Sequence, residues 1–144
     1  MSNGYISPLH LLITYLSASG GESSPANLHE DIHSVVQALK QMNYDTSRIR
    51  FRKSGKISPS ILSEISFLKS RMLLELDKKD LTYRFTELIR DSWNKENLAE
   101  FFKLINKSEM SKLLLALCEE IIRKRESPYN IDGKKYQEIA MSTR

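Results

Sequence analysis

Cysteine is nearly absent from this chain of 144 residues, and long hydrophobic runs are missing altogether. The single cysteine, Cys118, excludes an internal disulfide bond, and its position at the end of the apolar run 113–118 indicates a small buried thiol. That run is the longest purely apolar stretch, and it is far shorter than the ~18 residues that a membrane span requires. We therefore expect neither a disulfide-stabilised protein nor a membrane protein.

Glycine is also scarce, and its distribution excludes one class of site. Gly55 is the only glycine between positions 22 and 132, so the chain has no glycine-rich loop that could cradle a phosphate. The N-terminus has no basic segment, and the apolar stretch Leu9–Leu16 is interrupted by Thr14 and Tyr15, so we expect no secretory signal. These absences favour a cytoplasmic protein without a cofactor.

The overall composition is that of a soluble globular protein, with 40% hydrophobic and 28% charged residues. Its length corresponds to about one domain, large enough to fold without disulfides or a structural metal. The 22 Lys and Arg residues exceed the 18 Asp and Glu residues, which gives a net charge of +4. This basic excess favours polyanionic partners without identifying one.

Each of the four prolines follows a serine, a pair that favours the start of a helix. The serine oxygen can accept an N–H at the N-cap, and proline is tolerated at the first helical position. After Pro8, Pro25 and Pro59, apolar residues recur at spacings of three and four. This pattern predicts helices over residues 8–19, from 25 to about 42, and over 59–71.

The segments around the third helix differ in pattern. In residues 48–56, Ile49 and Phe51 alternate with arginines, which predicts a short strand or extended connection with the apolar side chains facing the core. Apolar residues in 74–76 and 81–85 flank the charged stretch 77–80, which predicts a β-hairpin.

The remainder of the chain is predicted to be mostly helical. Thr86 can cap a helix that contains Trp93, and a longer helix is expected over 108–125. The apolar stripe of that longer helix is wide enough for burial between its own domain and a second subunit, or for packing on its own domain alone. The predicted units are a domain at 1–93, a helical extension at 94–126, with a possible homodimer interface at 97–125, and a polar tail at 127–144.

The order of these elements over residues 8–93 resembles that of a winged helix-turn-helix DNA-binding domain. The stretch Gly55-Lys56-Ile57-Ser58-Pro59 introduces the third helix, and Phe85-Thr86-Glu87-Leu88 ends the hairpin. The resemblance implies a mainly α fold with a small β-hairpin and extra C-terminal helices. It also implies double-stranded DNA as the partner.

The residues themselves suggest how such a domain contacts DNA. No acidic residue occurs between positions 46 and 63, whereas five cations occur in 48–56, so this segment can contact phosphates. The predicted outer face of the third helix is small and polar, which suits a major groove about 12 Å wide. Asp77 and Asp80 offset the lysines at the hairpin tip, so we expect only a weak contact there. The candidate nucleic-acid-binding residues are Arg48, Arg50, Arg52, Lys53 and Lys56, then Ser60, Ser63, Ser66 and Lys69, and finally Lys78 and Lys79.

One enzyme signature competes with this interpretation. His29-Glu30-Asp31-Ile32-His33 matches the H-E-x-x-H pattern of zinc peptidases, and Glu87, which forms an E-x-x-x-D pattern with Asp91, is available as a third ligand. Only 28 residues precede the motif, too few for the substrate-binding sheet of such an enzyme, and the histidines flank the predicted buried stripe with Glu30 further out. We therefore expect no enzyme and no bound metal.

The expected function is that of a transcriptional regulator that binds double-stranded DNA mainly through phosphates. A winged-helix module for protein interaction, similar to an antitoxin, is the first alternative, because a fold does not determine its function. A small zinc peptidase is the second. A structural metal on His29 and His33 also stays open.

Overall fold

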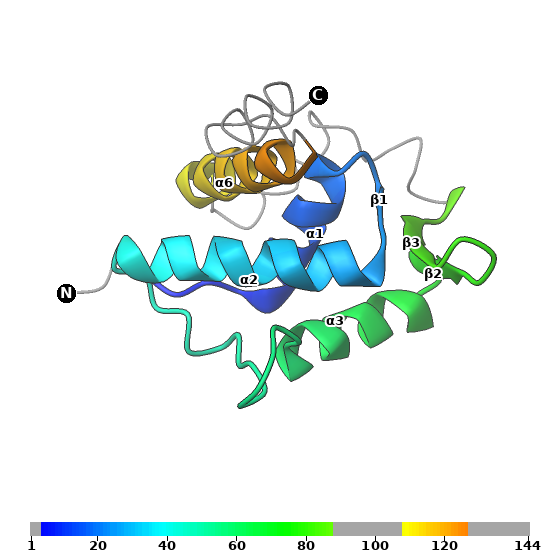
Figure 1. Cartoon of the computed structure of the whole chain (residues 1–144), viewed down its shortest axis with the longest axis horizontal. Helices are drawn as coiled ribbons and strands as arrows, with labels where there is room; N and C mark the ends of the chain where they lie inside the picture. The colour runs from blue at the N-terminus through cyan, green and yellow to red at the C-terminus, as the bar shows by residue number, and fades with distance from the viewer. Residues whose placement is uncertain (1–3, 88–107, 127–144) are drawn as a thin grey trace, which may run out of the picture.

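The computed structural model describes residues 4–87 and 108–126 of the chain. Three helices form at the predicted serine-proline pairs: α1 (Pro8–Ala18), α2 (Pro25–Gln41) and α3 (Pro59–Ser70) (Figure 1). At each start the serine hydroxyl accepts the backbone N–H three residues later, at 3.3 Å for Ser7, 3.2 Å for Ser24 and 3.3 Å for Ser58. The three predicted helices and their caps are confirmed, and each helix ends about one residue earlier than predicted.

All three helices also end in the same way, with a residue of positive φ that reverses the chain. These residues are Gly20 (φ 80°), Asn43 (φ 65°) and Met72 (φ 60°). In each case the next N–H donates back to a carbonyl five residues earlier, as from Leu73 to Leu68 at 3.0 Å. Glycine and asparagine suit this conformation, whereas methionine does not.

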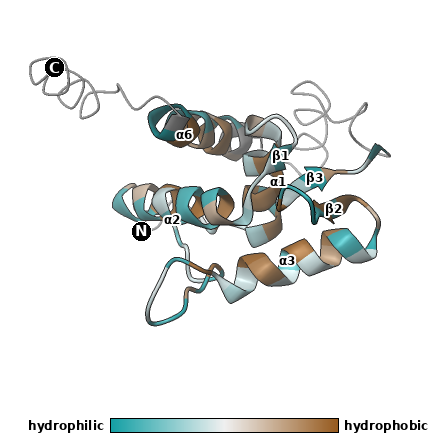
Figure 2. Ribbon diagram, turned by 45° about the vertical axis from the view of Figure 1, so that its right-hand side comes forward, coloured by the Kyte–Doolittle hydropathy of each residue, from teal (hydrophilic) through white to brown (hydrophobic). Residues whose placement is uncertain are grey.

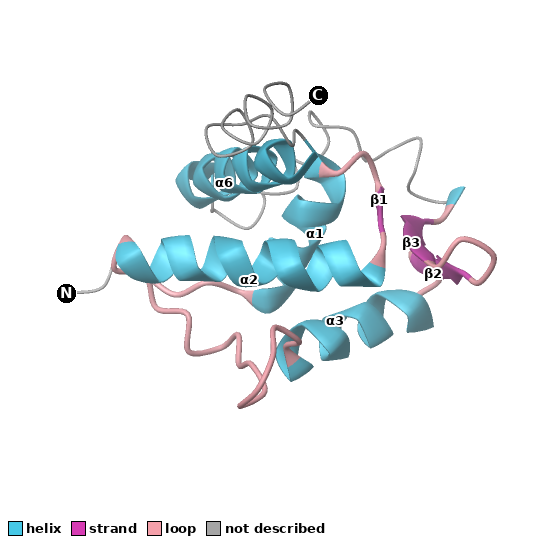
Figure 3. Ribbon diagram, in the orientation of Figure 1, coloured by secondary structure: helices cyan, strands magenta, loops and turns pink. Residues whose placement is uncertain are grey.

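A small antiparallel sheet lies beside these helices, with strand order β1-β3-β2. The hairpin is formed by β2 (Leu74–Asp77) and β3 (Thr82–Phe85), as the sequence predicts, although Asp77 belongs to β2 and the tip is 78–81. Figure 3 shows this hairpin in magenta beyond the end of α3. The third strand, β1 (Glu22–Ser23), pairs with β3 and was not predicted, because two residues are too few to show alternation.

The helix α6 (Ser108–Glu126) packs against α1 and α2 of the same chain. Leu114, Cys118 and Ile122 are buried in the common core. Burial raises the pKa of the Cys118 thiol, so the interpretation of Cys118 as a small buried group is confirmed. Part of the apolar stripe is thus used within one chain, while Leu113, Leu117 and Ile121 are only partly buried.

Several predicted features lie outside the described residues. These are most of the helix capped by Thr86, the apolar residues of 98–105 and the tail at 127–144. The described part is mainly helical with a three-stranded antiparallel sheet. Within it, no helix combines the length and the hydropathy needed to cross a membrane.

Candidate nucleic-acid interface

The segment 48–56, here called the basic connection, leads from the end of α2 to the start of α3. The sequence predicts a short strand or an extended connection, and no strand forms here: Ile49 N–H donates to the Thr46 carbonyl at 3.0 Å, and Arg52 N–H donates to the Ile57 carbonyl at 3.1 Å. No strand among residues 4–87 and 108–126 pairs with the basic connection. Figure 2 shows this hydrophilic connection projecting beyond the helices.

The backbone of the basic connection is nevertheless fixed to the first turn of α3. Arg50 N–H donates to the Ser60 hydroxyl at 3.0 Å, and the Arg50 carbonyl accepts the Ser58 hydroxyl. Ile49 is buried and Phe51 is partly buried against the core, so the predicted inward direction of both is confirmed. These anchors hold the arginine side chains at the surface next to α3.

The five cations of the basic connection differ in their surroundings. Lys56 forms an ion pair with Glu30 at 2.5 Å, and the Arg48 guanidinium lies 3.7 Å from the centre of the Tyr5 ring. Arg50, Arg52 and Lys53 are exposed, and none of them forms an ion pair with a residue in 4–87 or 108–126. Of the five cations in the basic connection, these three are therefore the most available to an anionic partner.

The exposed side of α3 agrees in part with the prediction. Ser63, Ser66 and Lys69 are exposed, as expected for residues that could reach a partner. Ser60 is only half-exposed, and its oxygen accepts the Arg50 N–H, so it serves the anchoring of the basic connection. Phe67, to which the sequence analysis assigned no role, is 42% exposed on this helix.

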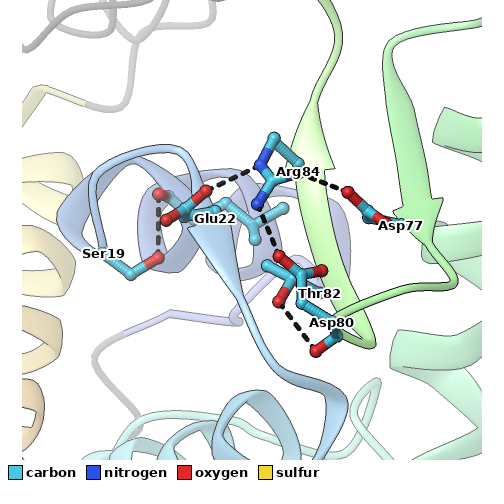
Figure 4. A network of polar contacts seen from close by, with 7 residues as sticks. Ser19, Glu22, Asp77, Asp80, Thr82 and Arg84 are labelled. Carbon is cyan, nitrogen blue, oxygen red and sulfur yellow. Dashed lines mark hydrogen bonds and ion pairs between the residues drawn. The ribbon is translucent and has the colours of Figure 1, made fainter.

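The hairpin carries a charge cluster that the sequence analysis missed. Arg84 of β3 donates to Glu22 at 2.7 Å, to Asp77 at 3.0 Å and to Asp80 at 3.1 Å (Figure 4). The Lys79 backbone N–H and Arg84 both lower the pKa of Asp77. One guanidinium thus serves three carboxylates, which leaves an acidic excess beside Lys78 and Lys79 at the exposed tip.

The His29–His33 segment does not gather a metal site in the described part of the chain. Glu30 is held by Lys56, and the His33 ring packs edge-on against Phe51 with centroids 5.0 Å apart. Burial, and secondly the Arg52 charge, lower the pKa of His29. Among residues 4–87 and 108–126, no group of three His, Cys, Asp or Glu side chains is placed to hold a metal.

Asp31, in the middle of the same motif, is buried in the interior of the domain, and its exposed fraction is 2%. It accepts the Tyr15 hydroxyl at 2.7 Å and the Arg125 Nε–H at 2.8 Å, and the Tyr15 hydroxyl also lies 3.1 Å from the Ser23 hydroxyl. Burial and the Asp31 hydrogen bond raise the pKa of Tyr15. Helical spacing could have revealed Asp31, because it lies three residues after Leu28 and four before Val35 on the buried face.

Comparison with known proteins adds no relative: no protein-family model, curated protein or solved structure matches this chain.

Proposed function

We propose that this chain is a winged-helix protein that binds double-stranded DNA, mainly through phosphate contacts, and regulates transcription. Support for the fold comes from the order α1-β1-α2-α3-β2-β3, with β1 beside β3 and the hairpin directly after α3. In such a domain the third helix enters the major groove and its surroundings contact the backbone. The basic connection lies at the start of that helix.

The observation that carries the proposal is the exposure of Arg50, Arg52 and Lys53 without an ion pair in the described residues. A surface cation already paired with a carboxylate must lose that partner before it neutralises a phosphate. An unpaired cation has no such cost, and its binding releases counterions from the DNA. Lys69 on α3 is the next candidate, whereas the acidic excess around Arg84 makes the hairpin tip a weak contact.

Fluorescence anisotropy of a mixed-sequence duplex, titrated across roughly 50–200 mM salt, tests the proposal. We expect binding that weakens steeply with salt. The triple variant Arg50→Ala, Arg52→Ala, Lys53→Ala should bind more weakly, and the magnitude of its log–log salt slope should fall by about 2 to 3.

The matched control removes three exposed cations elsewhere: Lys40→Ala on α2 with Lys112→Ala and Arg123→Ala on α6. It changes the net charge equally but leaves the basic connection intact. If both triple variants lose the same affinity and slope, the attraction is a property of total charge, and the basic connection is not the interface. Absence of duplex binding at the lowest salt contradicts the proposal as a whole.

A module that binds protein is the second candidate, and exposed apolar side chains favour it. Phe67 on α3, Met72 between α3 and β2, and Leu81 at the hairpin tip are 42%, 74% and 61% exposed. Association of two copies through α6 belongs to the same class, because Leu113, Leu117 and Ile121 are only partly buried. A light-scattering mass equal to one chain at tens of micromolar protein contradicts the dimer.

A further inference from the structure

Phe67 is a large aromatic side chain on a helix face that is otherwise polar, with the partly buried Glu64 one turn before it. Ser63 and Ser70 lie one turn before and after it, and Ser66 is its neighbour; all three are exposed. The opposite side of α3 supplies Ile61, Ile65 and Leu68 to the core. Phe67 is therefore not a core residue, and it is longer than the exposed serine side chains next to it.

Positive charge lies at both ends of this face. Arg71 places its guanidinium carbon 5.3 Å from the centre of the Phe67 ring, and Lys69 is exposed in the same turn. At the other end, the hydrogen bond from Arg50 to Ser60 holds the basic connection beside the first turn. The distance along the helix from Ser60 to Arg71 is about 17 Å at 1.5 Å per residue. This arrangement suits a polyanion whose phosphates lie at both ends of the helix. Between those ends the face presents Phe67, the exposed serines and the partly buried Glu64.

We infer that Phe67 contacts the C5 methyl group of a thymine in the major groove and thereby sets part of the sequence preference. The inference rests on the proposed DNA-binding function and specifies what the helix face reads. The thymine methyl is the one apolar group that the base pairs present in that groove, and phenylalanine is among the side chains that contact it. The neighbouring serines are short enough to let the ring approach the base edge.

The experiment uses the full chain and a duplex chosen by it. A preferred sequence is selected from a random duplex pool, and each thymine is then replaced singly by deoxyuridine, which removes only the methyl group. We expect at least one replacement to weaken binding about fourfold, because the complex then lacks the burial of one methyl group. Phe67→Ala should bind the thymine duplex about as weakly as the unmodified protein binds the deoxyuridine duplex. Its affinity should not fall further when thymine is replaced by deoxyuridine. Its salt slope should be unchanged, because no charge is removed.

Met42→Ala is the matched control, since Met42 is 41% exposed and lies at the end of α2 instead of on α3. It should retain the discrimination between thymine and deoxyuridine. If Phe67→Ala also retains it, or if the unmodified protein binds with a steep salt dependence yet shows no discrimination at any position or selects no sequence, the inference is wrong while the proposed function stands. If no duplex binding occurs at low salt, both are wrong.

Discussion

The Arg125 Nε–H is directed at both carboxylate oxygens of Asp31, at 3.1 and 2.8 Å, across 94 positions of sequence. The pair joins the last turn of α6 to the second turn of α2, and the Tyr15 hydroxyl adds α1 to the same cluster. Asp31 is almost fully buried, and Arg125 is 27% exposed at its side chain. This cluster ties α6 to α1 and α2 by hydrogen bonds, in addition to the apolar packing of α6 in the core.

Removal of Arg125 is therefore expected to be costly. Arg125→Met leaves the Asp31 carboxylate buried with the Tyr15 hydroxyl as its one remaining hydrogen-bond donor among the described residues, and we expect the free energy of unfolding to fall by about 3 kcal/mol. Urea denaturation followed by circular dichroism measures this. Arg123→Met is the control, because Arg123 is exposed and its ion pair among the described residues is with Glu120 on the same helix, so its change should stay within about 0.5 kcal/mol. Equal losses in the two variants contradict a special role for the buried pair.

Met72 occupies a helix end that favours glycine, and this gives a second stability prediction. Its φ is 60° and its side chain is 74% exposed, so the side chain contributes little packing to offset the strain. Met72→Gly is expected to stabilise the protein by about 1 kcal/mol. The equivalent position of α1 provides the opposite test.

Gly20 has a φ of 80° and no atom within 4 Å of the place of a Cβ, so Gly20→Ala adds backbone strain without a clash. We expect it to destabilise by about 1 kcal/mol. Thermal unfolding of both variants checks the pair. A lower melting temperature for Met72→Gly means that the contacts of the methionine side chain stabilise the protein by more than the backbone strain at positive φ destabilises it.

The ion pair between Lys56 and Glu30 withholds one cation of the basic connection from a partner. Glu30→Gln removes this competitor and leaves the lysine in place. We expect stronger duplex binding and a log–log salt slope steeper by about one unit, with little change in stability because both side chains are about half exposed. Anisotropy titrations over several salt concentrations measure the slope. An unchanged slope places Lys56 outside the interface.

We expect His29 to make the stability of the fold sensitive to mild acid. Its pKa in the folded protein is lowered, first by burial and then by the Arg52 charge, so the unfolded chain binds the proton more readily. The stabilising contribution of neutral His29 is complete above the ordinary histidine pKa of about 6.5 and is lost as the pH falls below it. Urea unfolding at about pH 7.5 and about pH 5.5 should show a smaller difference for His29→Gln than for the unmodified protein.

Arg52→Gln provides an intermediate case for the same experiment, because it removes the second cause and leaves the burial. Its pH sensitivity should lie between those of the other two proteins. If His29→Gln shows the full sensitivity of the unmodified chain, the acid response arises at other groups.

Local sequence accounts for much of the fold. Serine-proline pairs and apolar spacing determine where α1, α2 and α3 begin, because capping and amphipathic packing act within a few residues. Alternation around a charged turn likewise determines the hairpin. The cations of the basic connection were visible as a run without acidic residues, and Ile49 and Phe51 were correctly predicted to face inward.

The tertiary structure decided which charged side chains are available to a partner. Glu30 and Lys56 are 26 positions apart, and Arg84 and Glu22 are 62 apart, so no local pattern could show that they pair. The same holds for Asp31 and Arg125, whose attachment depends on how α6 packs across α1 and α2. Propensity and periodicity act over one or two helical turns, whereas the charge that remains at a surface depends on which distant side chains the packing brings within hydrogen-bond reach. The sequence by itself determined the helices, the hairpin and the basic composition of the connection; only the packed chain decided that Arg50, Arg52 and Lys53 stay unpaired among the described residues while Lys56 does not.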